Sequence, residues 1–217
     1  MTFDLKLGAI VCLLLCVLGC ESAYYNTMEN FGIHKRDILV DRVVDARDAQ
    51  QDAQEQFKSA LDEFKSVVNV EGGKLEKAYS RLNKEFEESE ESADLIRERI
   101  ASIESVADAL FKEWEVELKQ YTSANLRRES QAQLSATRSK YRQLLSVMHK
   151  AESRLTPVLN SMRDQVLYLK HNLNARAIQS LKGEVVTINR DVDKLLKAME
   201  RAITEADDFI REMKIGS

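Results

Sequence analysis

The sequence predicts an all-α protein, an elongated antiparallel helical bundle or coiled coil of about four long helices. The 217 residues include Gly 7 and Pro 1, and 31% are charged, a composition typical of long amphipathic helices. Apolar residues recur at alternating steps of four and three along most of the chain, which indicates helices that pack along a narrow apolar seam. The breaks between these seams are short, so consecutive helices should pair antiparallel.

The first segment, residues 1–19, has the features of a secretory signal peptide. Leu7 to Gly19 is an uncharged, mostly apolar run preceded by Lys6. As a helix this run would span only about 20 Å, too short for a bilayer core of about 30 Å. A positive start followed by a short apolar run is typical of a signal peptide. We therefore expect residues 1–19 to be removed on secretion.

The residues that follow this run indicate a lipid anchor. Val17 to Cys20 reads VLGC and resembles the lipobox of bacterial lipoproteins, with an aliphatic residue three places before the cysteine. The resemblance implies that Cys20 becomes the lipidated first mature residue, and three acyl chains would anchor it firmly. An ordinary cleaved signal or an uncleaved anchor is the alternative. Glu21, where Asp would favour retention in the inner membrane, implies a location at the outer membrane, facing the periplasm.

The three cysteines do not predict a metal site. Cys12, Cys16 and Cys20 recur every four residues, but the first two lie inside the predicted signal peptide. The mature chain would keep only the modified Cys20, and therefore no disulfide. Its stability must then come from packing.

Residues 20–35 form the lipidated cysteine and a predicted tether without helical periodicity. Tyr24, Tyr25, Met28 and Phe31 lie there among polar residues. They are candidates for membrane or partner contact, because amphipathic aromatic rings favour the membrane interface. The alternative is that they dock on the base of the helical domain, which we expect to span residues 36–217.

The first helix is predicted from a seam in which only Gln50 is polar. Its members are Leu39, Val43, Ala46, Gln50, Ala53, Phe57, Ala60, Phe64 and Val67. The stretch from Asn69 to Gly73 then interrupts the pattern, and glycine tolerates the positive backbone angles of a turn that ends a helix. We therefore expect a hairpin tip at Gly72, Gly73 and Lys74, a second candidate for partner contact.

The tip does not predict a nucleotide site. Gly73-Lys74 is followed by Leu75 where a phosphate-binding loop needs Ser or Thr, and Val68 stands where its first glycine would be.

The second helix is predicted from a long seam: Leu75, Tyr79, Leu82, Phe86, Ser89, Ala93, Ile96, Ile100, Ile103, Ala107, Leu110, Trp114, Glu117 and Tyr121. Thr122 to Asn125 is rich in capping side chains and predicts the next turn.

The third seam runs through Leu134, Thr137, Tyr141, Leu144, Met148, Ala151, Leu155, Val158 and Met162, and then shifts through Val166, Leu169 and Leu173. It keeps its phase across Pro157, which predicts a bend in one helix and not a new domain. We expect the last turn at Ser180 to Gly183. A fourth seam follows: Val185, Ile188, Val192, Leu195, Met199, Ala202, Ala206, Phe209 and Met213.

The seams predict helices of roughly 33, 48, 55 and 30 residues. Because the second outruns the first by about 15 residues, its far end should extend about 20 Å past the start of the first. Trp114 is expected to be a core aromatic residue near that end.

Side chains that could carry chemistry are scattered. The carboxylates from Glu85 to Glu91 should fan around a solvated helix face, and His34, His149 and His171 stand alone, so we expect no metal site. The sequence also has no Gly-x-Ser-x-Gly turn and no cysteine nucleophile that survives maturation. We therefore expect neither an enzyme nor a cofactor. The net charge of -4 gives no general basis for binding nucleic acid.

Several short segments carry a family resemblance. They are the lipobox, the Tyr24-Tyr25 and Met28-Glu29 pairs, KRDILV at 35–40, RVVDAR at 42–47 and QFKSAL at 56–61. Together they resemble an uncharacterised family of proteobacterial helical lipoproteins, classed as a domain of unknown function. The resemblance implies an envelope location and a helical form, and it supplies no activity, substrate or site.

These observations lead to a functional hypothesis. We expect a lipid-anchored periplasmic scaffold or adaptor that is not an enzyme and that contacts the membrane through its anchor and an unknown protein of the envelope. The alternatives are a regulatory activator of a cell-wall or transport enzyme, which acts through the tip, and a carrier of lipid or another hydrophobic ligand. The sequence does not decide between a monomer and a homo-oligomer, because such seams serve intramolecular hairpins and intermolecular coils equally.

Overall fold

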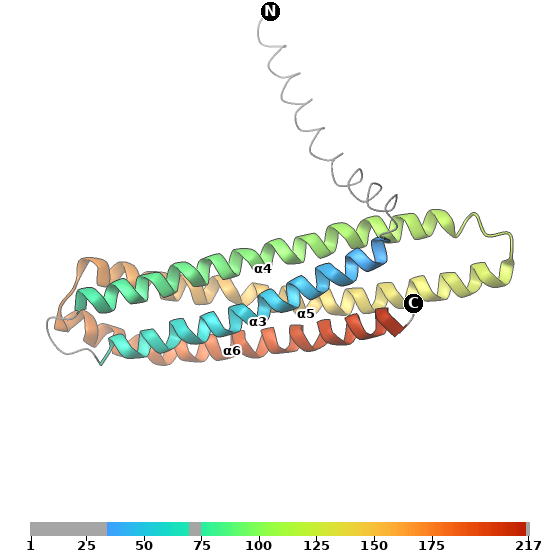
Figure 1. The fold of residues 1–217 in the computed structure, drawn as a ribbon. Helices are drawn as coiled ribbons and strands as arrows, with labels where there is room; N and C mark the ends of the chain where they lie inside the picture. The colour runs from blue at the N-terminus through green and yellow to red at the C-terminus, as the bar shows by residue number, and fades with distance from the viewer. Residues whose placement is uncertain (1–33, 70–74, 216–217) are drawn as a thin grey trace, which may run out of the picture. The chain divides into compact units, whose positions relative to one another are not determined.

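The computed structural model describes residues 34–69 and 75–215, which form four α-helices (Figure 1). The helices are α3 (Lys35–Val67), α4 (Leu75–Glu117), α5 (Ala124–His171) and α6 (Ala175–Ile215). The prediction of an all-α helical bundle is confirmed. None of these helices has a stretch apolar and long enough to span a bilayer.

Part of the predicted site lies outside the described residues. This holds for the signal peptide, for the lipobox with Cys20, and for the tether residues Tyr24, Tyr25, Met28 and Phe31. It also holds for Gly72, Gly73 and Lys74 at the predicted tip. Their roles stay predictions.

The chain divides into two compact units. Unit 1 comprises Met1–Arg42 and Ser102–Ala136, and unit 2 comprises Val43–Ala101 and Thr137–Ser217. The boundaries fall inside α3, α4 and α5, whereas α6 belongs to unit 2 alone.

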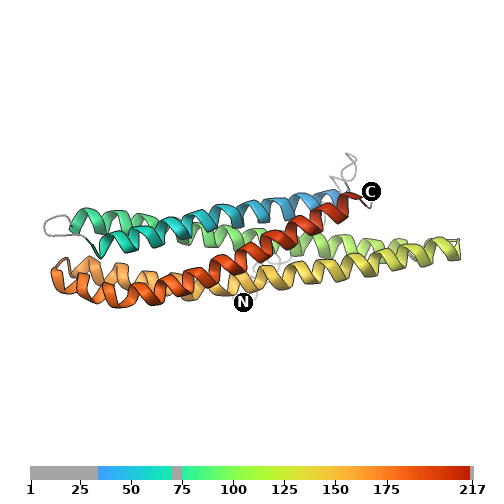
Figure 2. The same ribbon diagram turned by 90° about the horizontal axis from the view of Figure 1, so that it is seen from below.

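In unit 2, polar contacts identify α4 as the neighbour of both α3 and α5. The side-chain amide of Gln56 on α3 donates to the Glu85 carbonyl on α4 at 3.1 Å. Arg97 of α4 donates to the Thr156 hydroxyl of α5 at 3.2 Å. Both pairs of helices lie side by side in the two ribbon views (Figures 1 and 2).

Two further contacts close the ring of four helices. Lys140 Nζ of α5 lies 2.8 Å from a carboxylate oxygen of Glu212 on α6, and the Gln54 amide of α3 donates to the Leu196 carbonyl of α6 at 3.0 Å. Each helix of unit 2 therefore packs between the helices before and after it in the ring. This arrangement is the antiparallel up-and-down bundle that short connections favour.

The predicted seams form the core. All nine members of the first seam are buried, and so are Ile188, Val192, Leu195, Met199, Ala202, Ala206, Phe209 and Met213 of the fourth. Removal of such apolar surfaces from water is the main driving force for packing helices together. The heptad spacing therefore identified the buried faces correctly over most of the bundle.

The second helix ends earlier than predicted. Glu117 and Tyr121, the last two members of its seam, are exposed, whereas Leu118 is buried. The backbone amides of Lys119 and Gln120 bond to carbonyls three residues earlier, at 3.2 and 2.9 Å, so the chain tightens into a turn after Glu117. Residue spacing alone cannot detect such a change, because the next apolar side chain still falls in phase.

The start of α5 follows its capping signal. The Ser123 hydroxyl accepts a hydrogen bond from the Leu126 amide at 3.4 Å, and its carbonyl accepts from Arg127. This contact satisfies backbone donors that the first turn of a helix leaves free. The prediction of a turn in this segment is confirmed.

The predicted last turn, Ser180 to Gly183, is wrong. These residues lie within α6, and the chain instead reverses at 172–174. Asn172 donates to the Tyr168 carbonyl at the end of α5, and Asn174 accepts from the Ala177 amide at the start of α6. Two asparagine caps therefore decided the turn, although a glycine is usually the stronger helix-breaking signal. α5 and α6 consequently have 48 and 41 residues instead of roughly 55 and 30.

Pro157 lies inside α5, as predicted from the continuous seam. Leu155 and Val158 on either side of it are buried. Proline removes one backbone donor, and the helix continues because the apolar face on both sides stays packed.

In unit 1, α4 extends past the start of α3. Lys35 Nζ, at the first residue of α3, lies 3.1 Å from the Glu113 carboxylate of α4. The last residues of α4 and the following turn therefore lie beyond the first turn of α3, in the predicted direction.

Candidate functional site: a basic groove between helices α5 and α6

The surface of unit 2 is hollowed along the line where α5 and α6 meet. Two adjoining hollows, of about 540 and 230 Å³, share Val147, Lys197 and Arg201. We call their combined lining the basic groove. It consists of Val147, Lys150, Arg154, Lys194, Lys197, Ala198, Glu200, Arg201, Thr204 and Glu205.

Helical spacing places the cations of the basic groove on two facing edges. Lys150 and Arg154 are four residues apart on α5, and Lys194, Lys197 and Arg201 follow at steps of three and four on α6. Residues three or four apart lie on the same side of a helix. Each row flanks a buried seam, so both rows border the same line of contact between the helices.

Four of these cations have no hydrogen-bond or ion-pair partner among the described residues. They are Lys150, Arg154, Lys197 and Arg201. The fifth, Lys194, lies 3.1 Å from Asp191. The hydrogen bond from Lys194 lowers the pKa of Asp191, and a bond from Arg190 lowers it further. Glu200 and Glu205 also line the groove, but neither forms an ion pair with these four cations among the described residues, so the groove keeps a net positive charge.

The same line of contact is neutralised farther along. Lys140 binds Glu212 at 2.8 Å, which raises the pKa of Lys140. Gln143 donates to Glu205 at 3.1 Å, at the edge of the basic groove. Polar contacts between α5 and α6 are therefore present on this side of the basic groove, whereas the four cations within it make none among the described residues.

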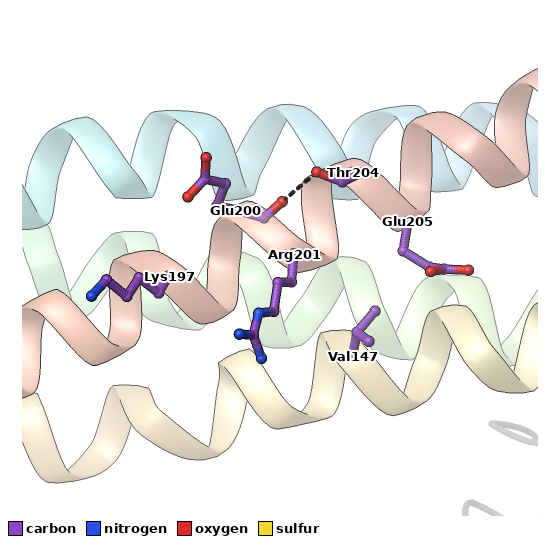
Figure 3. Close-up of a pocket in the computed structure, with 6 residues that line it drawn as sticks. All are labelled: Val147, Lys197, Glu200, Arg201, Thr204 and Glu205. Atoms are coloured by element: carbon purple, nitrogen blue, oxygen red, sulfur yellow. Dashed lines mark hydrogen bonds between the residues drawn. The ribbon is translucent and has the colours of Figure 1, made fainter.

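Figure 3 shows how the side chains of α6 lie in the groove. Arg201 reaches from α6 toward α5 and ends near Val147, whereas the carboxylate of Glu200 points to the other side of α6. The Thr204 hydroxyl donates to the Glu200 carbonyl at 2.9 Å. The Val147 side chain is half-buried and Ala198 is buried. These two apolar residues form the floor of the groove, and the cations surround it.

This arrangement can bind an anionic surface. Guanidinium groups bind carboxylates or phosphates with two parallel hydrogen bonds, and lysines add mobile point charges. Like charges on facing helices repel each other, and an incoming anion relieves that repulsion. Exposed cations keep their hydration, so the groove carries little cost while it is empty.

Sequence reasoning missed the basic groove. None of its residues belongs to a known motif, and the net charge of the chain is negative. The signal that could have found it is the repetition of cations at steps of three and four beside two consecutive seams. That signal has meaning only when the two rows face each other.

The carboxylates of the acidic stretch from Glu85 to Glu91 mostly bind neighbouring side chains. Glu85 accepts from Gln56, Glu87 from Asn83, and Glu88 and Glu90 pair with Lys84 and Arg163. The carboxylates therefore spread around the helix, as predicted. In the described part of the chain, no three His, Cys, Asp or Glu residues are grouped as a metal site would require.

The histidines and Trp114 have ordinary surroundings. His149 lies 2.8 Å from Glu152 on its own helix, and His34 and His171 are exposed. Trp114 is half-buried in unit 1 and donates its indole N–H to Ser130 at 2.8 Å. Trp114 therefore lies near the far end of α4, as predicted, but it is only half-buried, and the prediction of a core aromatic residue is wrong.

Two polar seam positions differ in how they are satisfied. Ser89 is fully buried and donates to the Glu85 carbonyl at 2.7 Å. Gln50 is equally buried, but within residues 34–69 and 75–215 neither its amide nitrogen nor its amide oxygen has a hydrogen-bond partner. Gln50 is thus an unsatisfied polar group in the core of unit 2.

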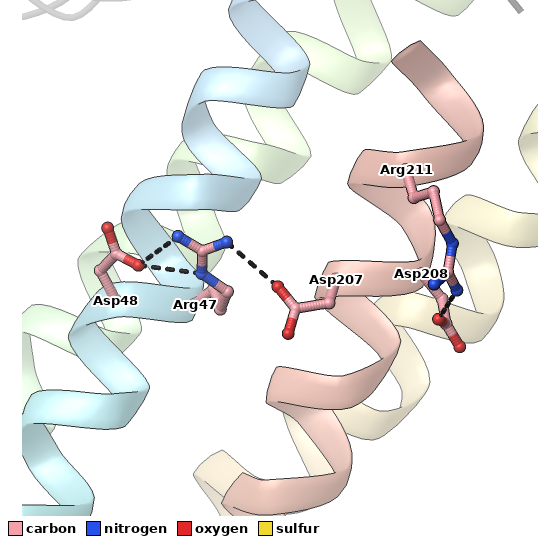
Figure 4. Close-up of polar contacts among 5 residues, drawn as sticks. All are labelled: Arg47, Asp48, Asp207, Asp208 and Arg211. Atoms are coloured by element: carbon pink, nitrogen blue, oxygen red, sulfur yellow. Dashed lines mark hydrogen bonds and ion pairs between the residues drawn. The ribbon is translucent and has the colours of Figure 1, made fainter. Parts of the chain in front are cut away.

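An ion-pair network joins α3 and α6 on another side of unit 2. Arg47 lies between Asp48 and Asp207, at 2.6 and 3.0 Å (Figure 4). The bond to Asp48 chiefly raises the pKa of Arg47, and the bond to Asp207 adds to it. On the same stretch of α6, Asp208 pairs with Arg211. These charges are matched, unlike those of the basic groove.

Comparison with known proteins identifies the family and nothing beyond it. The family model described as "Protein of unknown function (DUF2959)" matches residues 24–213. The chain therefore belongs to this family. No curated protein and no solved structure matches the chain significantly.

Proposed function

We propose that this member of the DUF2959 family is a lipid-anchored, non-enzymatic scaffold or adaptor of the bacterial envelope, which binds an anionic partner surface through the basic groove. The observation that carries the proposal is the set of four unpaired cations around an apolar floor. A surface of this kind serves recognition, because complementary charge sets the specificity and rate of association.

The sequence supports the anchor. A short apolar run ends in the VLGC sequence at 17–20, and two or more acyl chains give stable attachment to a membrane. Glu21 favours the outer membrane, with the helical part in the periplasm. The proposed adaptor would therefore act close to a membrane surface.

The filled core supports a binding role at the surface over a role as a carrier of hydrophobic ligands. Phe57, Leu82, Ile96 and Leu155 are among the fully buried side chains of unit 2. Protein interiors of this kind are close-packed. A ligand inside the bundle would require the helices to separate, whereas the basic groove is already open to solvent.

The anchor is tested with the full chain in its host. The wild-type protein should fractionate with membranes and carry an acylated N-terminal Cys20 in mass spectra, and Cys20→Ala should abolish both properties. An unmodified, soluble wild-type protein would contradict the anchor.

The groove is tested separately by placing a photoreactive amino acid at Val147 in living cells. One defined crosslinked product should form and should disappear when Lys150, Arg154, Lys197 and Arg201 are changed to Glu. The same photoreactive residue at the exposed Val186 of α6 is the matched control. A product that survives the reversal of charge would contradict an electrostatic docking site.

A further inference from the structure

We propose that the basic groove binds a second copy of this chain, and that its occupant is the acidic outer face formed by α3 and α4. This inference rests on the proposed function, because it names the partner of the same groove. It rests on three features of unit 2, namely the opposite charge of two surfaces, their nearly equal level along the bundle, and the ring order of the helices.

Charge is divided unequally between the two hairpins of unit 2. The parts of α3 and α4 in this unit hold 14 acidic and eight basic side chains, whereas those of α5 and α6 hold 15 basic and ten acidic side chains. Complementary charge of this kind selects partners and steers their encounter. Each copy therefore offers both halves of a complementary contact.

The acidic outer face is defined by four exposed carboxylates, Asp52 and Glu55 on α3 and Glu87 and Glu91 on α4. Asp52, Glu55 and Glu91 have no ion-pair partner among the described residues, and Glu87 binds only the uncharged Asn83, at 2.8 Å. The ring order α3, α4, α5, α6 places this face on the side of the bundle opposite the α5–α6 contact. One copy thus cannot bring its own two surfaces together.

The two surfaces lie at nearly the same level along the bundle, most closely on the side of α3. Gln54, beside Glu55, contacts Leu196, beside Lys197 of the basic groove. On the side of α4, Glu90, beside Glu91, pairs with Arg163, which lies nine residues beyond Arg154 of the groove on α5. Copies standing side by side and pointing in the same direction would therefore bring cations of one copy to carboxylates of the next.

The proposed anchor would impose this parallel orientation. Lipid attachment through Cys20 gives every copy the same end at the membrane, and confinement to that surface raises the effective concentration. Individual exposed ion pairs are weak and are screened by salt. The expected contact is therefore weak in solution and strong only among anchored copies. Because the two surfaces differ, each copy can bind one neighbour on each side, which gives a row and not a closed pair.

Pairs of cysteines in the full-length, membrane-bound protein test the row. Thr204→Cys lies at the rim of the basic groove, and Gln51→Cys lies on the exposed side of α3, between the levels of the Arg47–Asp207 and Gln54–Leu196 contacts. A short bifunctional maleimide should link a chain with both changes into a ladder of oligomers. Either change alone should give at most a trace of dimer.

Two controls make the test specific. Thr204→Cys combined with Ser80→Cys places the second thiol on α4 beside Arg81, which pairs with Glu63 far from the level of the groove. This chain should form no ladder. In the Thr204→Cys, Gln51→Cys chain, Lys150→Glu with Arg154→Glu, Lys197→Glu and Arg201→Glu should reduce the ladder at least tenfold.

A charge exchange gives the decisive result. The groove reversal and the reversal of Asp52, Glu55 and Glu91 to Lys should each reduce the ladder at least tenfold. When the two variants are expressed together, the intact groove of one can bind the intact acidic face of the other, so crosslinked pairs should return. The inference would be overturned if no ladder formed although both thiols were fully labelled. It would also be overturned if the ladder did not respond to the charge reversals.

The outcome is distinguishable from failure of the proposed function. If no ladder forms but the photoproduct at Val147 contains another envelope component and still requires the groove cations, the inference is overturned and the proposed function stands. If neither the ladder nor the photoproduct depends on these cations, both are overturned.

Discussion

Two grooves border helix α5 in unit 2, and they differ in how their charges are arranged. The groove toward α4 is lined by Glu90, Asp94, Arg97, Thr156, Leu159, Asn160 and Arg163. There Arg163 pairs with Glu90, and its Cζ lies over the Phe86 ring, 5.8 Å from the ring centroid. Arg97 there binds Asp94 and Thr156. In the groove toward α6, four cations have no such partner in the part of the chain that the structure describes. In the groove toward α4 the charged side chains therefore join the two helices, whereas these four cations of the basic groove do not.

The difference shows that an unpaired polar group has opposite meanings in water and in the core. An exposed cation without a partner is still hydrated and costs little. The buried amide of Gln50, also without a partner, has lost its water. The first can be kept for binding at almost no cost in stability, whereas the second lowers stability directly.

Gln50→Leu should raise the free energy of unfolding by about 1–3 kcal/mol, because it removes a buried amide that lacks hydrogen bonds. Urea unfolding followed by circular dichroism measures the change. Gln54→Leu is the matched control, since the Gln54 amide donates to the Leu196 carbonyl. That control should lose about 0.5–1.5 kcal/mol. A loss of stability in Gln50→Leu would show that Gln50 has a partner in solution.

Arg163→Ala should lower the free energy of unfolding by about 1–2 kcal/mol, because it removes both an ion pair and a cation–π contact. Arg154→Ala, on the same helix in the basic groove, should change it by less than about 0.5 kcal/mol. Denaturant midpoints of the two variants decide the comparison. Equal losses would mean that the two grooves do not differ.

Gly183→Ala should raise the free energy of unfolding by about 0.5–1 kcal/mol, because glycine inside a helix is less favourable than alanine. An added methyl group would meet nothing within 4 Å. The thermal midpoint should rise accordingly, while crosslinking through the basic groove stays unchanged. A decrease would contradict the placement of Gly183 inside α6 and would restore the turn that the glycine suggested.

The smallest expected effect is a loss of stability at low pH through Asp191. The bond from Lys194 lowers the pKa of Asp191 in the folded protein, so the pair contributes stability above the unfolded pKa of about 3.9. That contribution is lost as the pH falls through the folded pKa. Asp191→Asn should therefore cost a few tenths of a kcal/mol at about pH 6 and nothing at low pH. Asp193→Asn, whose carboxylate binds the uncharged Asn189, is the control in the same pH series.

The first and fourth helices illustrate how far sequence spacing reaches. α3 runs from Lys35 to Val67 with every seam member buried, because alternating steps of three and four define one buried face whatever the partner helix is. α6 has the same regular seam, but its start was placed eight residues or more too late. Burial depends on periodicity, whereas a boundary depends on a few capping contacts.

The candidate site was less predictable for a physical reason. Each cation of the basic groove reads, in its own helix, as an ordinary solvated residue. The groove exists because Lys150 and Arg154 come to face Lys197 and Arg201 from a second helix. A contact between residues more than 40 positions apart depends on which helices are neighbours and on their relative level, and neither is contained in local periodicity.

The helical class, most of the buried faces and the expectation of a lipid anchor follow from the sequence, because composition, heptad spacing and a short processing motif are local properties. Packing of the helices sets where the last turn falls, leaves Gln50 buried without a partner among the described residues, and brings two rows of cations to one groove. These features arise from the way side chains of different helices meet, and charges that look alike along the chain separate into paired and unpaired groups only when the helices are packed.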